Sequence, residues 1–291
     1  MIRKNLADKY GIDVNQIKKL EDMAQYFDKI KNGESGVAPF GVDRNGPFNL
    51  MLRYNNMGEL LRGILAVNLN EPFKVVSLVD TAEYKQYTAL MRKWYETGYI
   101  NEDAPTLKKV EETLKLGKAA TRWHDTLKPG GELENMANFG GKELQFIKLT
   151  EPYASPTGPT STINAISRAS RNPERAMMFL NLVQTDSELF NVLCYGVEGK
   201  HFTKNADGSV HINTEAGYNP NANWVFGNSF YAYLPEGQDP KAFEETRKLN
   251  ETVAPYPLSG FTLNIEPITA EIRLVPAWLD QCRGFGRDSS I

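Results

Sequence analysis

The sequence predicts an α/β fold, because segments of helical periodicity alternate with short apolar runs bounded by turn residues. Three observations carry this prediction. They are a helix pair with clear start and stop signals near residue 180, a strongly periodic helix near residue 90, and a hairpin signal near residue 207. Helices and strands are therefore expected to be mixed along the whole chain.

The helix pair begins at Pro173, which follows an N-cap residue, Asn172, and favours the first helical turn. Apolar residues then recur at helical spacing on one face, at Ala176, Phe179, Leu180 and Val183. The Thr-Asp-Ser run at residues 185–187 ends this helix and starts a second one, which stops at Gly196. A β-type run at residues 162–167 precedes the pair, so this unit is predicted to be strand, helix and helix.

The other elements follow from the same two periodicities. The helix over residues 81–97 opens with a D-x-x-E pattern at residues 80–83, typical of a capping box, and ends at Gly98. An Asp-Gly pair at residues 207–208 predicts a hairpin, and the Pro/Gly/Ser-rich stretch 151–160 a linker. Further helices are expected over residues 19–31, 48–65, 106–116, 221–233 and 240–253, and strands over residues 37–42, 118–123 and 143–149.

Composition excludes several classes of protein. The chain has 291 residues, a formal net charge of −3 and 41% hydrophobic residues, values that are ordinary for a globular protein and argue against a nucleic-acid partner. No apolar run has membrane-spanning length. The two cysteines, Cys194 and Cys282, are too few for a disulfide framework, and Cys194 is expected to be a small core residue.

Two blocks of sequence resemble a known family. Residues 162–202 read TINAISRASRNPERAMMFLNLVQTDSELFNVLCYGVEGKHF, and residues 98–123 read GYINEDAPTLKKVEETLKLGKAATRW. Both resemble, in the expected order, segments of bacterial extracellular solute-binding proteins of family 1, the maltose-binding-protein-like capture subunits of ABC importers. The later block is most similar to the lipoprotein subgroup that binds oligosaccharides.

The resemblance implies a periplasmic-binding-protein-like class II fold, here mostly lobe two with part of lobe one. Residues 1–150 would form the first part of lobe two, residues 151–200 the crossing loop and a lobe-one segment, and residues 201–291 a hairpin and helices that return to lobe two. The family pattern breaks from about residue 274. The first third of the family's sequence has no counterpart here, so the chain is interpreted as part of a longer protein.

The implied function is the non-covalent capture of an oligosaccharide between two lobes, for delivery to ABC permease subunits. No cofactor is implied. The full-length protein would be an extracytoplasmic, cell-surface lipoprotein, held to the membrane only through a lipid anchor outside this stretch of sequence.

The candidate binding residues are aromatic and polar side chains in loops, because sugars present apolar C–H faces ringed by hydroxyl groups. Trp123, His124 and Asp125 follow an expected strand, at the end where α/β clefts bind ligands. By resemblance they match a tryptophan-bearing loop that stacks on sugar in maltose-binding relatives. The alternative is that Trp123 is the last core residue of the strand.

A second group lies later in the chain. Trp224 and Asn228 would share one face of the expected helix over 221–233, where a ring and an amide suit a saccharide; the alternative is a buried tryptophan. Phe48 and Phe261 align with aromatic cleft positions of the family, and Tyr153 lies in the crossing loop.

Catalysis has little support in the sequence. The common nucleophile, phosphate-binding, dinucleotide and zinc motifs are absent, and the three histidines lack metal-ligand spacing. The alternatives to the transporter hypothesis are a carbohydrate-active hydrolase with scattered carboxylates, and a scaffold that retains lobe two without binding.

Overall fold

The computed structural model describes the chain except for residues 62–64, 125–127, 155–161, 258–263, 265 and 272–291. The chain divides into two compact units, Met1–Pro257 and Leu258–Ile291. In the second unit, the described residues include a 3₁₀ helix at Glu266–Ile268. Phe261, Cys282 and the stretch from residue 274 lie outside the described residues, and the account below concerns the first unit.

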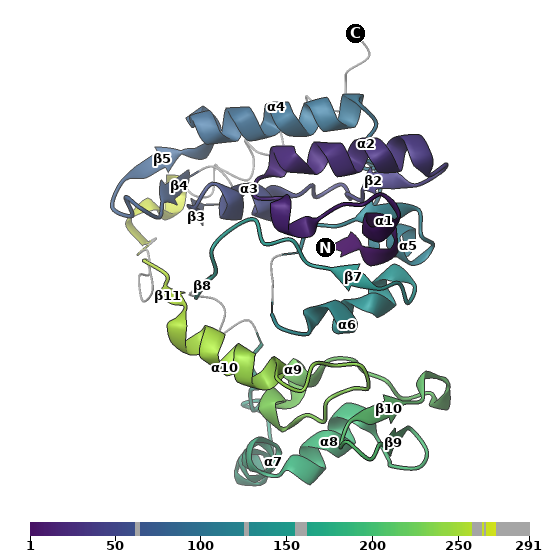
Figure 1. Cartoon of the computed structure of the whole chain (residues 1–291). Helices are drawn as coiled ribbons and strands as arrows, with labels where there is room; N and C mark the ends of the chain where they lie inside the picture. The colour runs from purple at the N-terminus through teal and green to yellow at the C-terminus, as the bar shows by residue number, and fades with distance from the viewer. Residues whose placement is uncertain (62–64, 125–127, 155–161, 258–263, 265, 272–291) are drawn as a thin grey trace. The chain divides into compact units, whose positions relative to one another are not determined.

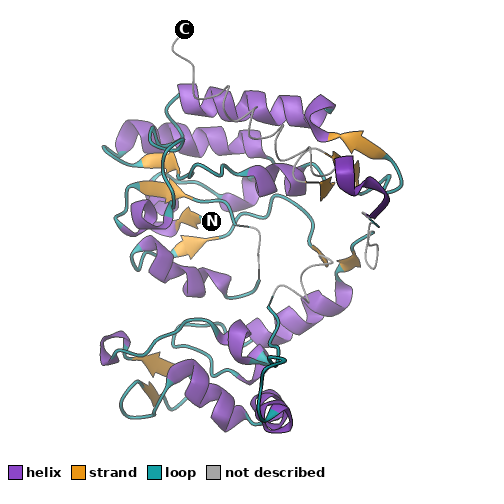
Figure 2. Ribbon diagram, turned by 180° about the vertical axis from the view of Figure 1, so that it is seen from behind, coloured by secondary structure: helices purple, strands orange, loops and turns teal. Residues whose placement is uncertain are grey.

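Helices and short strands alternate along this unit, as Figures 1 and 2 show. The α-helices are α1 (Lys4–Lys9), α2 (Ala24–Gly33), α3 (Phe48–Tyr54), α4 (Ala82–Glu96), α5 (Glu111–Lys115), α6 (Gly131–Met136), α7 (Pro173–Thr185), α8 (Ser187–Tyr195), α9 (Asn223–Phe226) and α10 (Ala242–Thr252). The strands are β1 (Ile2–Arg3), β2 (Ala38–Phe40), β3 (Met57–Leu61), β4 (Leu65–Asn68), β5 (Val75–Ser77), β6 (Ala119–Thr121), β7 (Leu144–Gln145), β8 (Tyr153–Ala154), β9 (Phe202–Lys204), β10 (Val210–Ile212) and β11 (Ala254–Pro255).

The largest sheet has the strand order β2-β6-β1-β7. β2 and β6 are parallel, whereas β1 is antiparallel to both of its neighbours, with Ile2 opposite Thr121 and Gln145. The strands expected over residues 37–42, 118–123 and 143–149 are all present in shortened form. Ile2 is completely buried, which fixes the face of the sheet that meets the core.

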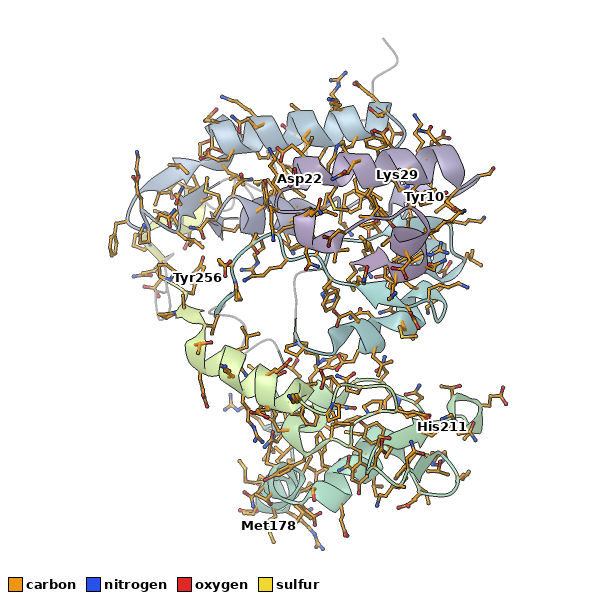
Figure 3. All side chains as sticks on the ribbon, in the orientation of Figure 1. Tyr10, Asp22, Lys29, Met178, His211 and Tyr256 are labelled. Carbon is orange, nitrogen blue, oxygen red and sulfur yellow. The ribbon has the colours of Figure 1, made fainter. Side chains whose placement is uncertain are left out.

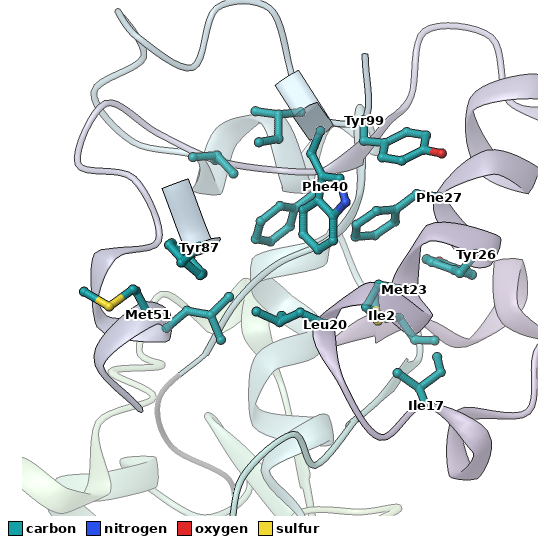
Figure 4. Packing of buried hydrophobic residues seen from close by; sticks show 14 of the residues in the cluster. Ile2, Ile17, Leu20, Met23, Tyr26, Phe27, Phe40, Met51, Tyr87 and Tyr99 are labelled. Atoms are coloured by element: carbon teal, nitrogen blue, oxygen red, sulfur yellow. The ribbon is translucent and has the colours of Figure 1, made fainter. Parts of the chain in front are cut away.

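The core against this sheet is aromatic. α2 and α4 lie side by side (Figure 1), and the Phe27 ring of α2 stands 5.0 Å from the Trp94 ring of α4, measured between ring centroids. Phe40 of β2 stacks on Phe27 at 5.9 Å, and the Tyr99 ring approaches Phe27 at 5.5 Å (Figure 4). Edge-on and offset rings are the arrangements that aromatic quadrupoles favour, so this cluster joins two helices to the sheet.

The α4 helix starts one residue later than expected. The Thr81 hydroxyl, and not the Asp80 carboxylate, accepts the Tyr84 N–H at 3.2 Å. Thr81 has the extended backbone that an N-cap residue needs, whereas Asp80 closes a preceding 3₁₀ turn. Gly98 takes a φ of +77° just past the helix end, as the stop signal predicted.

The helix expected over residues 48–65 is wrong in its second half. α3 ends at Tyr54, Asn56 adopts a φ of +53°, and the chain then forms the antiparallel sheet β3-β4-β5. Met57 and Val67 are buried by strand pairing, which a continuing helix would not achieve. The helix over 106–116 likewise shrinks to α5, because the Asp103 carbonyl accepts the N–H groups of Thr106 and Leu107 in a tight turn.

The helix pair is confirmed. α7 begins at Pro173 as expected, but the Asn172 side chain makes no capping hydrogen bond, so the N-cap role expected for it is wrong. Asp186 caps α8 by accepting the N–H groups of Glu188 and Leu189 at 2.9 and 3.0 Å. α8 stops at Gly196, which has a φ of +81°. The hairpin of β9 and β10 is also confirmed, with the Asp-Gly turn between the strands. A second core forms here around Val183, Phe190, Cys194, Tyr195, Phe202, Val210 and Ala232.

The strand expected over residues 162–167 is wrong. This segment has no regular secondary structure, because among the described residues no strand lies beside it to pair with its peptide groups. Strand conformation needs a hydrogen-bonded neighbour, and a suitable side-chain pattern alone does not supply one.

Two short strands, β8 and β11, pair although they lie about 100 residues apart in the sequence. β8 pairs in parallel with β11, with Tyr153 opposite Ala254 and Ala154 opposite Pro255. Residues 153–154 lie in the stretch predicted to cross between lobes. The division into lobes stays a prediction.

Cys194 is expected to be unreactive. Its side chain is 1% exposed, and burial raises the pKa of its thiol to about 12, so the nucleophilic thiolate is scarce at pH 8. In a Cys282→Ser background, Ellman's reagent should modify the native chain much more slowly than the guanidinium-unfolded chain. Equal rates in the two states would contradict the buried position.

Candidate functional site

Trp123 lies just beyond β6, where the strand ladder ends. The preceding residue, Arg122, still exchanges backbone hydrogen bonds with Met1 at 2.9 and 3.0 Å, and its guanidinium contacts Glu111 at 2.8 Å. Trp123 is half-buried and packs against the large aromatic core. One surface of Trp123 therefore lies against the core and another is exposed, and its role in binding stays a prediction.

The neighbouring candidates are only partly described. His124 is also half-buried, whereas Asp125 lies outside the described residues. Phe48 is the first residue of α3 and packs, half-buried, against the same core as Trp123. The backbone of Tyr153 belongs to β8. The structure thus brings Phe48 and Trp123 to the margin of one core.

Trp224 lies on α9 and is 55% exposed, so the alternative of a buried tryptophan is wrong. The expectation that Trp224 and Asn228 share a helix face is also wrong. α9 ends at Phe226, and a Cβ on Gly227 would lie 3.1 Å from both the Cγ1 and the carbonyl oxygen of Val183. The chain therefore passes close to α7 at Gly227, and the helix ends there because this glycine takes a non-helical backbone, with φ 174° and ψ −137°.

Asn228, which follows the end of α9, has a structural role. Its side-chain oxygen accepts the Phe230 N–H at 3.1 Å and caps a 3₁₀ turn at Ser229–Tyr231. One lone pair of its amide oxygen is thus engaged, which leaves the amide nitrogen and the second lone pair of the oxygen for a ligand.

A small hollow of about 70 Å³ lies beside Trp224. Its lining includes Asn219, Asn221, Asn223, Trp224, Tyr233 and Gln238. Carboxamides offer both donors and acceptors, and the rings offer flat apolar surface, which is the combination that a saccharide requires. The sequence analysis missed this group, although asparagine recurs at every second position from 219 to 223, directly before Trp224.

Hydrogen bonds hold the floor of this hollow. The Tyr195 hydroxyl donates to the Tyr233 carbonyl at 2.7 Å, and the Asn223 amide donates to the Tyr195 oxygen at 3.1 Å. Burial raises the pKa of Tyr195 to about 12, so its hydroxyl stays protonated and keeps donating at neutral pH. Asn223 is thereby oriented on the same short helix as Trp224.

The charged residues in the lining neutralise each other. Lys128 and Glu134 form an ion pair of 2.8 Å between the ammonium nitrogen and a carboxylate oxygen, and both line the hollow. The remaining polar groups named above are uncharged. This environment suits a neutral ligand better than an anion or a cation.

Metal and acid–base chemistry find little support in the described part of the chain. No group of three or more metal-ligating side chains occurs there. His201 accepts the Val197 N–H at 2.9 Å, and His211 contacts Glu236 at 2.7 Å, so each serves a local contact. Among the described residues, no helix combines the length and the apolar character needed to cross a membrane.

Comparison with known proteins finds proteins of similar sequence and structure. No family model matches. A Streptococcus pneumoniae protein described as a carbohydrate ABC transporter substrate-binding protein is 26% identical over 289 residues, a match that covers 95% of this chain and 56% of that protein. The N-glycan transport solute binding protein NgtS of S. pneumoniae, crystallised with Man1GlcNAc, superposes with a TM-score of 0.78 at 25% identity, over 96% of this chain and 62% of that one.

The crystal structure of NgtS described without a ligand superposes with a TM-score of 0.80 at 24% identity, over the same shares of the two chains. The chain thus spans a little more than half the length of the relatives it matches. The expected periplasmic-binding-protein-like α/β fold is confirmed. The chain is similar to a carbohydrate ABC transporter substrate-binding protein and to NgtS, and it has the fold of solute-binding proteins over the part that it spans.

Proposed function

We propose that the chain serves the capture of an oligosaccharide by an ABC importer. The observation that carries this proposal is the match over 96% of the chain to NgtS, a protein solved with Man1GlcNAc bound. The exposed Trp224 ring beside three asparagines supports it, because this chemistry suits a neutral saccharide. The relatives are transporter binding proteins and not enzymes.

The proposed ligand contacts are those expected from the sequence, with the asparagine group added. They are Phe48, Trp123, His124, Asp125, Tyr153, Trp224, Asn228 and Phe261, together with Asn219, Asn221 and Asn223. We further propose that ABC permease subunits receive the ligand and that the full-length protein works outside the cytoplasm as a lipid-anchored protein. The transporter descriptions of the relatives support this part of the proposal.

Calorimetric titration of the purified chain with a glycan panel that includes Man1GlcNAc and Man5GlcNAc tests the function. Saturable binding without release of reducing ends is the expected result. Release of reducing ends above background would favour the hydrolase alternative. Failure of every glycan to bind would count against a direct role of this chain in capture.

Trp224→Ala is expected to weaken binding of the best glycan in the panel by roughly thirtyfold, which corresponds to the loss of about 2 kcal/mol for an aromatic anchor. The exposed position of Trp224 means that the melting temperature should not change, so the loss would report binding and not folding. Phe73→Ala is the matched control, because Phe73 is 98% exposed in the loop between β4 and β5. An unchanged dissociation constant for Trp224→Ala would remove Trp224 from the site.

A further inference from the structure

Lys128 and Glu134 belong to one local unit of the chain, the turn that leads into α6. The Gly131 N–H donates to the Lys128 carbonyl at 3.0 Å, and Gly130 takes a φ of +77° within this turn. Glu134 follows in the first turn of α6. The turn therefore brings the two side chains together, and their charged ends meet at 2.8 Å with 39% and 37% of the side chains exposed.

This unit packs against another segment that lines the hollow. A Cβ added to Gly130 would overlap the side-chain amide of Gln238, so the glycine backbone lies directly against that amide. The Gln238 N–H in turn donates to the Pro235 carbonyl at 3.0 Å. Gln238 and Pro235 line the hollow, as do both members of the ion pair. The pair is therefore part of the wall of the hollow and remains within reach of a ligand.

The hollow contains these two charges and no net charge. Lysine and glutamate are both ionised at neutral pH, and no other charged side chain occurs among the described residues of the lining. His211 and Glu236 adjoin lining residues in the sequence, but they contact each other at 2.7 Å and do not line the hollow (His211 is labelled in Figure 3). The charge that a ligand meets there is consequently set by Lys128 and Glu134 alone.

We propose that the Lys128–Glu134 pair selects uncharged glycans and rejects acidic and amino sugars. This inference rests on the proposed capture of a saccharide beside Trp224. A sugar carboxylate or ammonium group in the hollow would lose hydration and meet no net opposite charge, whereas a hydroxyl group can bond to the carboxamides. Removal of either partner would leave one unpaired charge in the wall, so the selection should then turn toward a sugar of the opposite charge.

Calorimetry with matched probes tests the selection. The probes are Man1GlcNAc and derivatives in which a carboxylate or an ammonium group replaces the primary hydroxyl, made separately on each of its sugar residues. The wild-type chain should bind Man1GlcNAc at least about tenfold more tightly than the charged derivatives of one residue. Glu134→Gln should raise the affinity for the carboxylate derivative relative to Man1GlcNAc at least about tenfold, and Lys128→Gln should do the same for the ammonium derivative.

Two controls separate charge from structure. The double variant Lys128→Gln with Glu134→Gln removes both charges and should restore the preference for Man1GlcNAc. Glu132→Gln changes a residue of α6 outside the lining and should leave every ratio unchanged. Melting temperatures should stay close to that of the wild-type chain, because partly exposed ion pairs add little stability.

Two results would overturn the selection while the proposed function stands. One is an unchanged affinity ratio for every derivative in both single variants. The other is an equal loss of all probes in these variants, which would assign the pair a structural role. Failure of the wild-type chain to bind Man1GlcNAc or any other glycan would overturn both proposals, so the two failures are told apart by the wild-type titration.

Discussion

Replacing Phe27 by alanine is expected to lower the free energy of unfolding by about 3–5 kcal/mol. Phe27 is 1% exposed, and its ring lies within 6 Å of Phe40, Trp94 and Tyr99, measured between centroids. Its loss opens a cavity at the point where α2, α4 and the largest sheet meet. Because whole domains are stable by only about 5–15 kcal/mol, one substitution would remove a large share of the total.

Urea unfolding followed by circular dichroism measures this effect. Phe73→Ala removes the same ring from an exposed loop and should change stability by no more than about 0.5 kcal/mol. If Phe27→Ala were no more destabilising than this control, the aromatic cluster would not hold the two helices to the sheet.

Asn191→Ala is expected to cost roughly 2–6 kcal/mol, from two polar groups left unpaired at about 1–3 kcal/mol each. Asn191 is 2% exposed on α8. Its amide nitrogen donates to the Tyr231 carbonyl at 2.8 Å, and its amide oxygen accepts the Tyr233 N–H at 2.8 Å. These two bonds attach the loop after Trp224 to the second core.

Asn181→Ala supplies the control, because Asn181 is an exposed asparagine on α7 and should change stability by at most about 0.5 kcal/mol. Hydrogen exchange adds a local readout, since the Tyr233 amide should lose protection in Asn191→Ala before the large core does. Retained protection of that amide would mean that other contacts hold the loop in place.

The sequence predicted elements well where local signals decide structure. The start of α7 depends on the fixed φ of Pro173, the start of α8 on capping by Asp186, and the stops at Gly98 and Gly196 on glycine's backbone freedom, all within a few residues. The prediction failed at β3 and β4. The apolar residues there fit both the helical and the strand periodicity, and pairing with neighbouring strands decided between the two structures. Such pairing depends on tertiary neighbours that a local pattern does not contain.

The candidate site was predictable by residue type more than by geometry. Trp224 lies on a helix, as expected, and its ring is exposed, but its pairing with Asn228 failed because α9 ends at Phe226, where Gly227 takes a non-helical backbone and approaches Val183 closely. That approach joins residues far apart in the sequence, so no periodicity reports it. The asparagine repeat before Trp224 was visible in the sequence, but only the folded structure shows that these asparagines line the same hollow as Tyr233.

The place of β1 in its sheet has a consequence for how the chain is made. Ile2 is synthesised well before its partners Thr121 and Gln145, which lie much later in the sequence. At about 5–20 residues per second, β1 waits roughly 7–30 s on the ribosome for both neighbours. β2 also waits for β6, so the largest sheet closes only after β7 has been translated. The apolar residues of α2 lack the complete sheet as a packing partner throughout that interval, which leaves apolar surface of the nascent chain open to association.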